Sequence, residues 1–249
     1  MQAPAVRIIA RPAVAGIMRC TEVEERMSGS PALPLTIDVI SDVVCPWCYI
    51  GKRRLEAALA LVAQEGAAGE VSVRWHPFEL NPDLPREGLD RRTYLETKFG
   101  GPERAAQIYE RLRAAGATVG IPFALDRIAR QPNTRDAHRL VGWAQARGDP
   151  EPLVERLFAA YFLEGRNPGE RGVLATIAGE AGLDPVAARA TLDSDEGRDE
   201  VETAERRAQE IGVSGVPFFI FNGHLAVSGA QEPRILAQAM AEAARAGAA

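Results

Sequence analysis

The feature that most constrains the fold is a C-P-W-C motif at residues 45–48, placed between an extended segment and a helical one. Residues 35–40 alternate apolar and polar side chains and are rich in β-branched residues, which predicts a strand. After the motif, apolar residues recur at helical spacing between 55 and 62, and residues 71–75 read as a second strand. This order predicts a parallel pair of strands joined by a right-handed crossover.

A long region of different character follows the second strand. From about residue 80 to residue 211, apolar side chains recur at the spacing of short helices. Such a length is too great for a structureless loop, so we expect a helical subdomain inserted into a sheet-based domain. The remaining elements are predicted in this order: a helix over 196–211, a strand over 217–221, a two-residue turn at Asn222-Gly223, a strand over 224–227 and a helix over 232–244.

The N-terminal region is poorly patterned. Residues 1–33 are expected to form a disordered extension, with initiation at Met18 or Met27 and a weak transit-like segment as alternatives. Arg11 and Pro12 interrupt the apolar core that a secretory signal needs. A membrane-spanning helix needs about 20 consecutive apolar residues, and the sequence contains no such run. The sequence therefore predicts a cytoplasmic location and no membrane contact.

The charge balance argues against a polyanionic partner. The 249 residues carry 29 basic and 34 acidic side chains, for a formal net charge of -5. Only two of the basic residues, Lys52 and Lys98, are lysines. Such a chain has no basic field to attract nucleic acid. Its 46% hydrophobic and 25% charged residues are typical of globular domains and exclude fibrous and disordered classes.

Cys45 and Cys48 carry the clearest chemical signal. A cysteine that opens a helix is stabilised as thiolate by free backbone N–H groups and by the helix dipole. Pro46 suits the first helical position, because its missing N–H costs nothing there. Cys45 is therefore expected to attack disulfides, and Cys48, one turn further on, to close a disulfide with it.

Two structural roles compete with a redox role for this pair. A zinc site needs four ligands, and the chain lacks both a second C-x-x-C and an H-x-x-x-H spacing. The other residues it offers as ligands are Cys20, His76, His138 and His224. A structural disulfide over so short a loop would constrain little chain entropy. We therefore favour a redox dithiol, and we expect no metal.

Three further residues are weaker candidates. Pro217 stands at the start of a strand, where proline is tolerated and where a trans peptide bond is the default. Asp42 is expected to cap the approach to the helix rather than to accept a proton near Cys48. His138 is expected to be a satisfied structural histidine rather than a general base. No G-x-S-x-G, Walker A or G-x-G-x-x-G pattern supports a hydrolase or a nucleotide site.

Several motifs together resemble the DsbA-like thioredoxin-fold oxidoreductases, and more narrowly the FrnE-type members. They are C-P-W-C-Y-I-G-K at 45–52, P-F-E-L-N-P at 77–82, Asn133-Thr134 with A-H-R-L at 137–140, and G-V-P-F-F at 215–219 followed by S-G-A-Q at 228–231. The resemblance implies an α/β thioredoxin fold. A helical subdomain, residues 81–195, is inserted between the N-terminal β-α-β unit and the C-terminal β-β-α unit, so residues 34–80 and 196–249 form the thioredoxin-fold domain.

The resemblance also implies roles for individual residues. Cys45 corresponds to the attacking thiol, Cys48 to the resolving thiol and Pro217 to a cis-proline that faces them. A cis bond would aim the Val216 backbone at an extended substrate peptide, which pairs as an added strand. The predicted substrate-binding residues are Pro46, Trp47, Val216 and Pro217.

Three aromatic residues, Trp47, Phe78 and Phe219, are candidates for the apolar wall of this groove. Core packing is the favoured expectation for each. One class of FrnE-type relatives carries a further cysteine pair near the C-terminus, but this chain has no cysteine after Cys48. That absence argues against isomerase chemistry that needs a second dithiol.

The leading hypothesis is a thiol-disulfide oxidoreductase that acts on protein or small-molecule thiols and disulfides, glutathione among them, without a cofactor. A second hypothesis is a glutathione-dependent isomerase of the 2-hydroxychromene-2-carboxylate type or a kappa-class glutathione transferase. Those relatives commonly have serine in place of the first cysteine and lack the second, so the intact C-P-W-C speaks against them. A third hypothesis is a thioredoxin-like binding module with incidental cysteines. The oligomeric state stays open, with a homodimer as one option.

Overall fold

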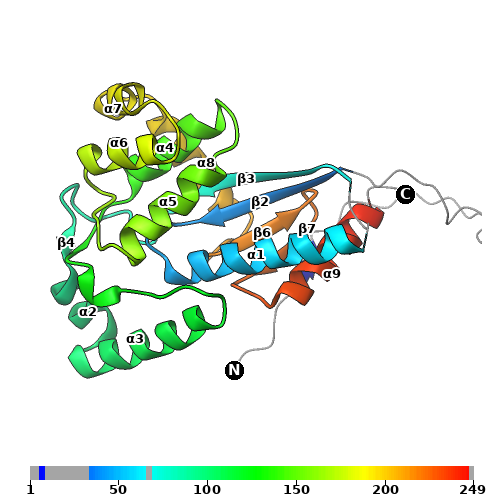
Figure 1. The fold of residues 1–249 in the computed structure, drawn as a ribbon, viewed down its shortest axis with the longest axis horizontal. Coiled ribbons are helices and arrows are strands. Elements are labelled where there is room, and N and C mark those ends of the chain that lie inside the picture. The colour runs from blue at the N-terminus through cyan, green and yellow to red at the C-terminus, as the bar shows by residue number, and fades with distance from the viewer. Residues whose placement is uncertain (1–5, 9–33, 66–68, 247–249) are drawn as a thin grey trace, which may run out of the picture.

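A five-stranded sheet forms the centre of the computed structural model, which describes residues 6–8, 34–65 and 69–246 (Figure 1). The strand order is β1-β7-β6-β2-β3. Strands β2 and β3 are parallel, and the other neighbours are antiparallel. The strands are β1 (Val6–Ile8), β2 (Leu35–Ser41), β3 (Val71–Pro77), β6 (Phe218–Phe221) and β7 (Leu225–Ser228).

Helices α1 (Pro46–Gln64) and α9 (Pro233–Ala246) pack against each other on one face of the sheet. Alternate residues of the strands enter the core on this face, including Ile37 and Val39 of β2 and Phe219 and Phe221 of β6. This alternation follows from the two-residue period of a strand. Helix α1, which carries the C-P-W-C motif, therefore packs on a layer of buried apolar side chains.

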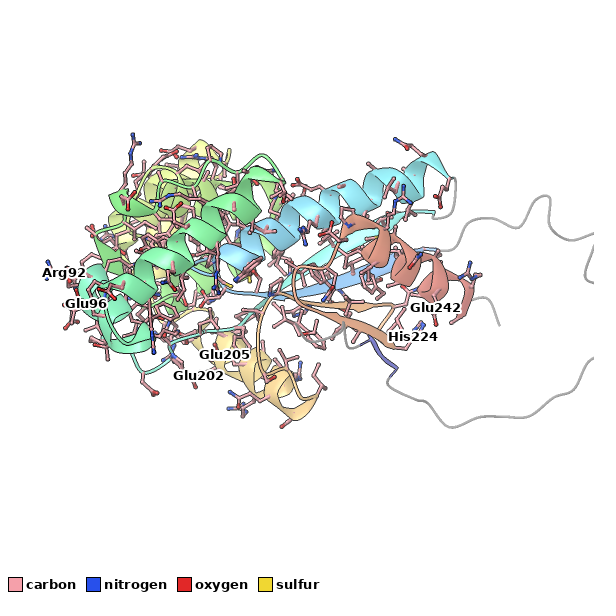
Figure 2. The ribbon with its side chains drawn as sticks, turned by 90° about the horizontal axis from the view of Figure 1, so that it is seen from below. Arg92, Glu96, Glu202, Glu205, His224 and Glu242 are labelled. Atoms are coloured by element: carbon pink, nitrogen blue, oxygen red, sulfur yellow. The ribbon has the colours of Figure 1, made fainter. Side chains whose placement is uncertain are left out.

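Helix α8 (Arg198–Glu210) covers part of the opposite face. Ile40 of β2 packs there with Ala208 of α8 and with Val213, and Phe218 and Ile220 of β6 join the same small cluster. Figure 2 shows α8, marked by Glu202 and Glu205, on the side of the sheet away from α1. The sheet is therefore enclosed between helices, as in other α/β domains.

The region between β3 and α8 forms a helical subdomain at one end of the sheet (Figure 1). Helices α2 and α3 form one pair, and α4 to α7 pack together as a second group. The bounds are α2 (Arg91–Phe99), α3 (Pro102–Ala117), α4 (Arg135–Gln145), α5 (Glu151–Phe162), α6 (Arg171–Glu180) and α7 (Pro185–Asp193). The sequence predicts only helices here, but β4 (Leu89–Asp90) and β5 (Arg130–Gln131) form a short antiparallel ladder.

Strand β1 corrects the expectation of a disordered extension over residues 1–33. Val6 pairs with Val227 and Ile8 with Leu225 of β7. The edge of β7 offers backbone N–H and C=O groups that a short β-branched segment can bind. The rest of the predicted extension lies outside the described residues. Within the described part of the chain, no helix is long and apolar enough to span a membrane.

The turn between β6 and β7 is one residue longer than predicted. It includes His224 as well as Asn222 and Gly223, because Phe221 pairs directly with Leu225. Asn222 (φ 48°) and Gly223 (φ 71°) both adopt the left-handed conformation that Asn-Gly turns favour.

Candidate active site

Cys45 lies where the chain leaves β2 and enters α1. It is the N-cap residue of α1, in an extended conformation (φ -90°, ψ 113°), and Pro46 is the first helical residue. The backbone N–H of Cys48 donates to the Cys45 carbonyl oxygen at 3.0 Å. Both thiols are free in this structure. The motif therefore places Cys45 at the positive end of the helix dipole, with Cys48 in the first turn.

The chain segment before β6 meets Cys45 from the other side. The Val216–Pro217 peptide bond is cis. The Cys45 thiol donates to the Val216 carbonyl oxygen across 3.7 Å. The fold thus brings two pairs of predicted site residues together, Cys45 with Cys48 and Val216 with Pro217. Cys45 and Val216 are 171 positions apart along the chain.

Gly51 permits this approach. A Cβ atom on Gly51 would lie 2.8 Å from Cγ of Pro217 and 3.3 Å from Cζ of Phe219. Distances below 3.0 Å are shorter than a carbon–carbon contact allows. The glycine in C-P-W-C-Y-I-G-K therefore has a packing reason, since only a residue without a side chain lets α1 contact the Pro217 ring.

Cys48 differs from Cys45 in its surroundings. It is 1% exposed. Burial, together with the neighbouring Cys45 thiol, raises the pKa of the Cys48 thiol well above its ordinary value, although Ser41 and the backbone of Asp42 oppose the shift. Cys48 is therefore held as a neutral thiol in the reduced protein.

Asp42 shapes the approach to α1, as the sequence predicts, and does more. Its Oδ1 accepts from the Val44 backbone N–H at 3.4 Å, and its carbonyl oxygen accepts from the Cys45 N–H at 3.0 Å. Its Oδ2 accepts from the Leu80 N–H at 2.9 Å, which fixes the loop after β3. The side chain is fully buried. It therefore ties the turn before α1 to the loop after β3, next to the cysteines.

His138 of α4 faces Asp42 inside the protein. Its Nε2 lies 3.4 Å from Oδ1 of Asp42 and, within the described residues, has no hydrogen-bond partner. The contact with Asp42 agrees with the expected structural role of this histidine, although Nε2 is not satisfied by a hydrogen bond as expected. Burial opposes a charge on the ring, but the Asp42 carboxylate overcomes it and raises the pKa of His138 above its ordinary value. The pair is a buried ion pair whenever His138 is protonated.

Glu79 and Arg135 extend this buried group toward α8. Glu79 Oε1 accepts from Arg135 Nε at 3.0 Å, and the Glu79 N–H donates to Oε1 of Glu205 at 2.7 Å. Burial and the Glu205 carboxylate raise the pKa of Glu79. The sequence analysis did not single out Glu79 or Arg135, since neither carries a motif of its own beyond P-F-E-L-N-P.

The three aromatic candidates separate clearly. Phe219 is fully buried in the main core, and Phe78 packs in the small cluster under α8. Trp47 is 43% exposed, so the expectation of core packing is wrong for this residue. It is the exposed residue between two buried cysteines at the start of α1.

A cavity of about 340 Å³ opens beside Cys45. Its size is at the lower end of the range for small-molecule sites. Cys45, Pro46, Trp47 and Val216 line one side, and residues of the helical subdomain line the other: Arg91, Tyr94, Leu95, Lys98, Phe99, Ile108, Tyr109 and Leu112. The sequence patterns did not predict this wall, because residues of α2 and α3 share a cavity with the C-P-W-C segment only in the folded chain. Fold and site together define a thioredoxin-fold protein with a pair of free thiols at a helix N-terminus.

The comparisons with known proteins place the chain in a family. The DSBA-like thioredoxin domain family matches residues 36–241. The protein belongs to this family, which confirms the predicted thioredoxin fold with its helical insertion and identifies it as a DsbA-like thiol-disulfide oxidoreductase.

Individual relatives agree with this assignment. The probable DsbA oxidoreductase SCO1869 from Streptomyces coelicolor is 34% identical, with a TM-score of 0.76 over 84% of this chain and 89% of that one. The uncharacterized protein YwbO from Bacillus subtilis (strain 168) is 27% identical over 207 residues, 83% of this chain and 96% of that protein. The cytosolic disulfide reductase DsbM from Pseudomonas aeruginosa, in a structure with GSH, shares the fold at 21% identity and a TM-score of 0.57, over 86% of this chain and 97% of that one.

Proposed function

We propose that the protein exchanges disulfides through Cys45 and Cys48, with Cys45 as the attacking thiol and Cys48 as the resolving thiol. The observation that carries this proposal is the position of Cys45. It lies at the N-terminus of α1, 3.7 Å from the Val216 carbonyl oxygen and on the wall of an open cavity. Cys48 is more deeply buried, and its raised pKa keeps it from competing for the substrate.

Reduction of a substrate disulfide proceeds in two exchanges. The Cys45 thiolate attacks one substrate sulfur, a Cys45–substrate disulfide forms, and the other substrate sulfur leaves as a thiolate that takes up a proton. Cys48 then loses its proton and attacks Cys45 Sγ, so the second substrate sulfur leaves and the Cys45–Cys48 disulfide forms. Two electrons pass from the protein dithiol to the substrate. Oxidation of substrate thiols is the same sequence in reverse.

The substrate surface in this proposal consists of Pro46, Trp47, Val216 and Pro217. Val216 supplies backbone beside Cys45, which an extended peptide can bind as an added strand. Trp47 supplies exposed apolar area at the same place. Its exposure supports a role in contact with substrate, since a large exposed apolar side chain costs less when a partner covers it.

Protein thiols and small-molecule thiols, glutathione included, are the proposed partners, and the cytoplasm is the proposed location. The cytosolic disulfide reductase DsbM, whose structure was solved with GSH, supports both. A glutathione-dependent isomerase is the second candidate, because a 2-hydroxychromene-2-carboxylate isomerase shares the fold at 20% identity and a TM-score of 0.59. The intact cysteine pair favours the first candidate.

Two variants test the proposal in a Cys20→Ser background, which leaves only the motif cysteines. Cys45→Ser should abolish the reduction of glutathione disulfide and of a disulfide-linked peptide. Cys48→Ser should instead accumulate mixed disulfides on Cys45, visible by mass spectrometry. Turnover by Cys45→Ser would refute the proposal. Tight glutathione binding by that inactive variant would favour the isomerase candidate.

The direction of electron flow follows from the redox equilibrium with glutathione, measured by thiol alkylation. A potential of about -120 to -180 mV would make the protein a disulfide donor, and one of about -270 mV would make it a reductase. A pair that does not oxidise reversibly would exclude both.

A further inference from the structure

The cavity beside Cys45 has an unusual charge. Its lining includes two cationic side chains, Arg91 and Lys98 of α2, and, among the described residues, no aspartate or glutamate. The whole chain has a net charge of -5. The positive character is therefore local to the cavity that the attacking thiol faces.

Lys98 is held at the mouth of the cavity by neutral groups. Its ammonium donates to Tyr94 Oη at 2.5 Å and to Asn81 Oδ1 at 3.2 Å, and Tyr94 Oη itself donates to Asn81 Oδ1 at 2.9 Å. No carboxylate in the described part of the chain forms an ion pair with it. The charge of Lys98 is thus positioned but not neutralised.

Arg91 lies deeper in the same cavity. It is only 8% exposed, and it donates from Nε to Tyr109 Oη at 3.1 Å and from Nη1 to Gln131 Oε1. Its guanidinium also lies 5.8 Å from the ring centre of Tyr94. Within the residues that the structure covers, it too has no carboxylate partner. A buried cation usually has one, because an uncompensated buried charge is costly.

The other lysine of the chain shows the contrast. Lys52 is buried and forms ion pairs with three carboxylates, those of Glu56, Glu151 and Glu155. Arg92, next to Arg91 on α2, pairs with Glu96 at 2.9 Å on the outer surface of the helical subdomain, where Figure 2 shows both. Within α2, the two cations that line the cavity therefore lack a carboxylate partner among the described residues, whereas Arg92 on the outer surface has one.

We propose that Lys98 and Arg91 bind a carboxylate that the substrate carries close to its reacting sulfur. This inference rests on the proposed function, since the cavity adjoins Cys45. An ammonium and a guanidinium in one cavity are a suitable pair for a carboxylate, because hydrogen bonds between ionised partners are the strong ones. The substrate class is then an acidic thiol or disulfide, either a free small molecule or an acidic residue beside a peptide cysteine.

Two small aromatic disulfides, one charged and one neutral, test the charge preference. One is the dianionic 5,5′-dithiobis(2-nitrobenzoate), and the other is the neutral 2,2′-dithiodipyridine. Each is mixed with the reduced protein in the Cys20→Ser background, and the second-order rate constant is read from the absorbance of the released thiol. Lys98→Gln removes the charge, Lys98→Arg keeps it, and Arg92→Gln is a matched loss of one positive charge on the same helix outside the cavity.

Lys98→Gln should slow the reaction with the dianionic disulfide about tenfold, the loss of one charge-assisted hydrogen bond, and change the reaction with the neutral one less than twofold. Lys98→Arg should restore most of the rate, and Arg92→Gln should leave both rates unchanged. An equal loss with both disulfides would overturn the proposal, since Lys98 would then act on the Cys45 thiolate. No change in either rate would overturn it as well.

A second arm identifies the source of the carboxylate. Two disulfide-linked peptides differ only in Glu or Gln beside the cysteine. A preference for the Glu peptide that Lys98→Gln abolishes supports an acidic peptide segment, whereas a charge preference limited to the small disulfides supports a free acidic thiol. No preference in either arm overturns the proposal. Failure of the proposed function would look different, because the unmodified reduced protein would then react with neither disulfide faster than Cys45→Ser does.

Discussion

His138 Nε2 lies 3.4 Å from Asp42 Oδ1, and both side chains are buried behind the C-P-W-C segment. The carboxylates that face the imidazole are Asp42, Glu79 and Glu205, and together they raise the pKa of His138 against the effect of burial. A histidine with a raised pKa binds its proton more tightly in the folded protein than in the unfolded chain. Its contribution to stability is complete below the unfolded value of about 6.5 and is lost as the pH rises through the folded value.

The free energy of unfolding should therefore fall as the pH rises above 6.5. Glu79 has the same sign, because its pKa is also raised, but its contribution begins to be lost at the lower pH where an unfolded glutamate titrates, about 4.3. Urea unfolding at pH 6, 7, 8 and 9 measures the slope. His138→Gln and Asp42→Asn should each flatten it by removing one partner of the pair. A slope that persists in both variants would contradict the role of this pair.

Gly51→Ala should damage the site without touching a cysteine. The new methyl group would lie 2.8 Å from Pro217 Cγ, so either α1 or the segment around Pro217 has to move. We expect a loss of about 1–3 kcal/mol in the free energy of unfolding and a slower reaction of Cys45. Gly142→Ala is the matched control, since it lies within α4 and a Cβ there meets no atom within 4 Å. That variant should gain about 0.5–1 kcal/mol from helix propensity. Equal effects of the two changes would argue against the Gly51 contact.

Lys52 joins the active-site helix to the helical subdomain. Its ammonium lies 2.6 Å from Glu151 Oε1 and 2.9 Å from Glu155 Oε2 of α5, and its side chain is 2% exposed. Lys52→Met would leave the carboxylates facing one another, so the free energy of unfolding should fall by about 2–3 kcal/mol. This is below the 3–5 kcal/mol of a fully buried pair, because the glutamates are partly exposed. Lys98→Met, at the exposed lysine, should change the free energy of unfolding by less than about 0.5 kcal/mol. Chemical denaturation of both variants checks the difference.

Local patterns account for the parts of the fold that were predicted. The strand over residues 35–40, Pro46 at the first helical position and a turn at Asn222-Gly223 depend on neighbours in the sequence. The structure has the first two as predicted, and the turn with His224 as a third residue. The three-residue strand at Val6–Ile8 and the two-residue ladder at Leu89–Asp90 are too short to carry a pattern. They form because a distant strand offers them hydrogen bonds.

The candidate site divides in the same way. The cysteines and the G-V-P segment were found from their motifs. The cationic wall was missed, because Arg91 and Lys98 of α2 line the same cavity as Cys45 only in the folded chain. The same holds for the ion pair of Asp42 and His138, which are 96 positions apart in the sequence and meet only when α4 packs on the sheet. Long-range packing, unlike a capping residue or a turn, leaves no local trace in a single sequence.

Trp47 and Phe219 give the sharpest test of which aromatic residue serves the substrate. Trp47 is 43% exposed between the two cysteines, whereas Phe219 is fully buried in the main core. Trp47→Ala should leave the free energy of unfolding within about 0.5 kcal/mol of the original value, since no core contact is lost. It should raise the KM for a disulfide-linked peptide severalfold, because the peptide loses apolar area at the cavity. Phe219→Ala should instead cost about 3–5 kcal/mol of stability through the void it leaves. Trp47→Ala could instead destabilise the protein as much as Phe219→Ala and leave the KM unchanged. Trp47 would then be a structural residue and not part of the substrate surface.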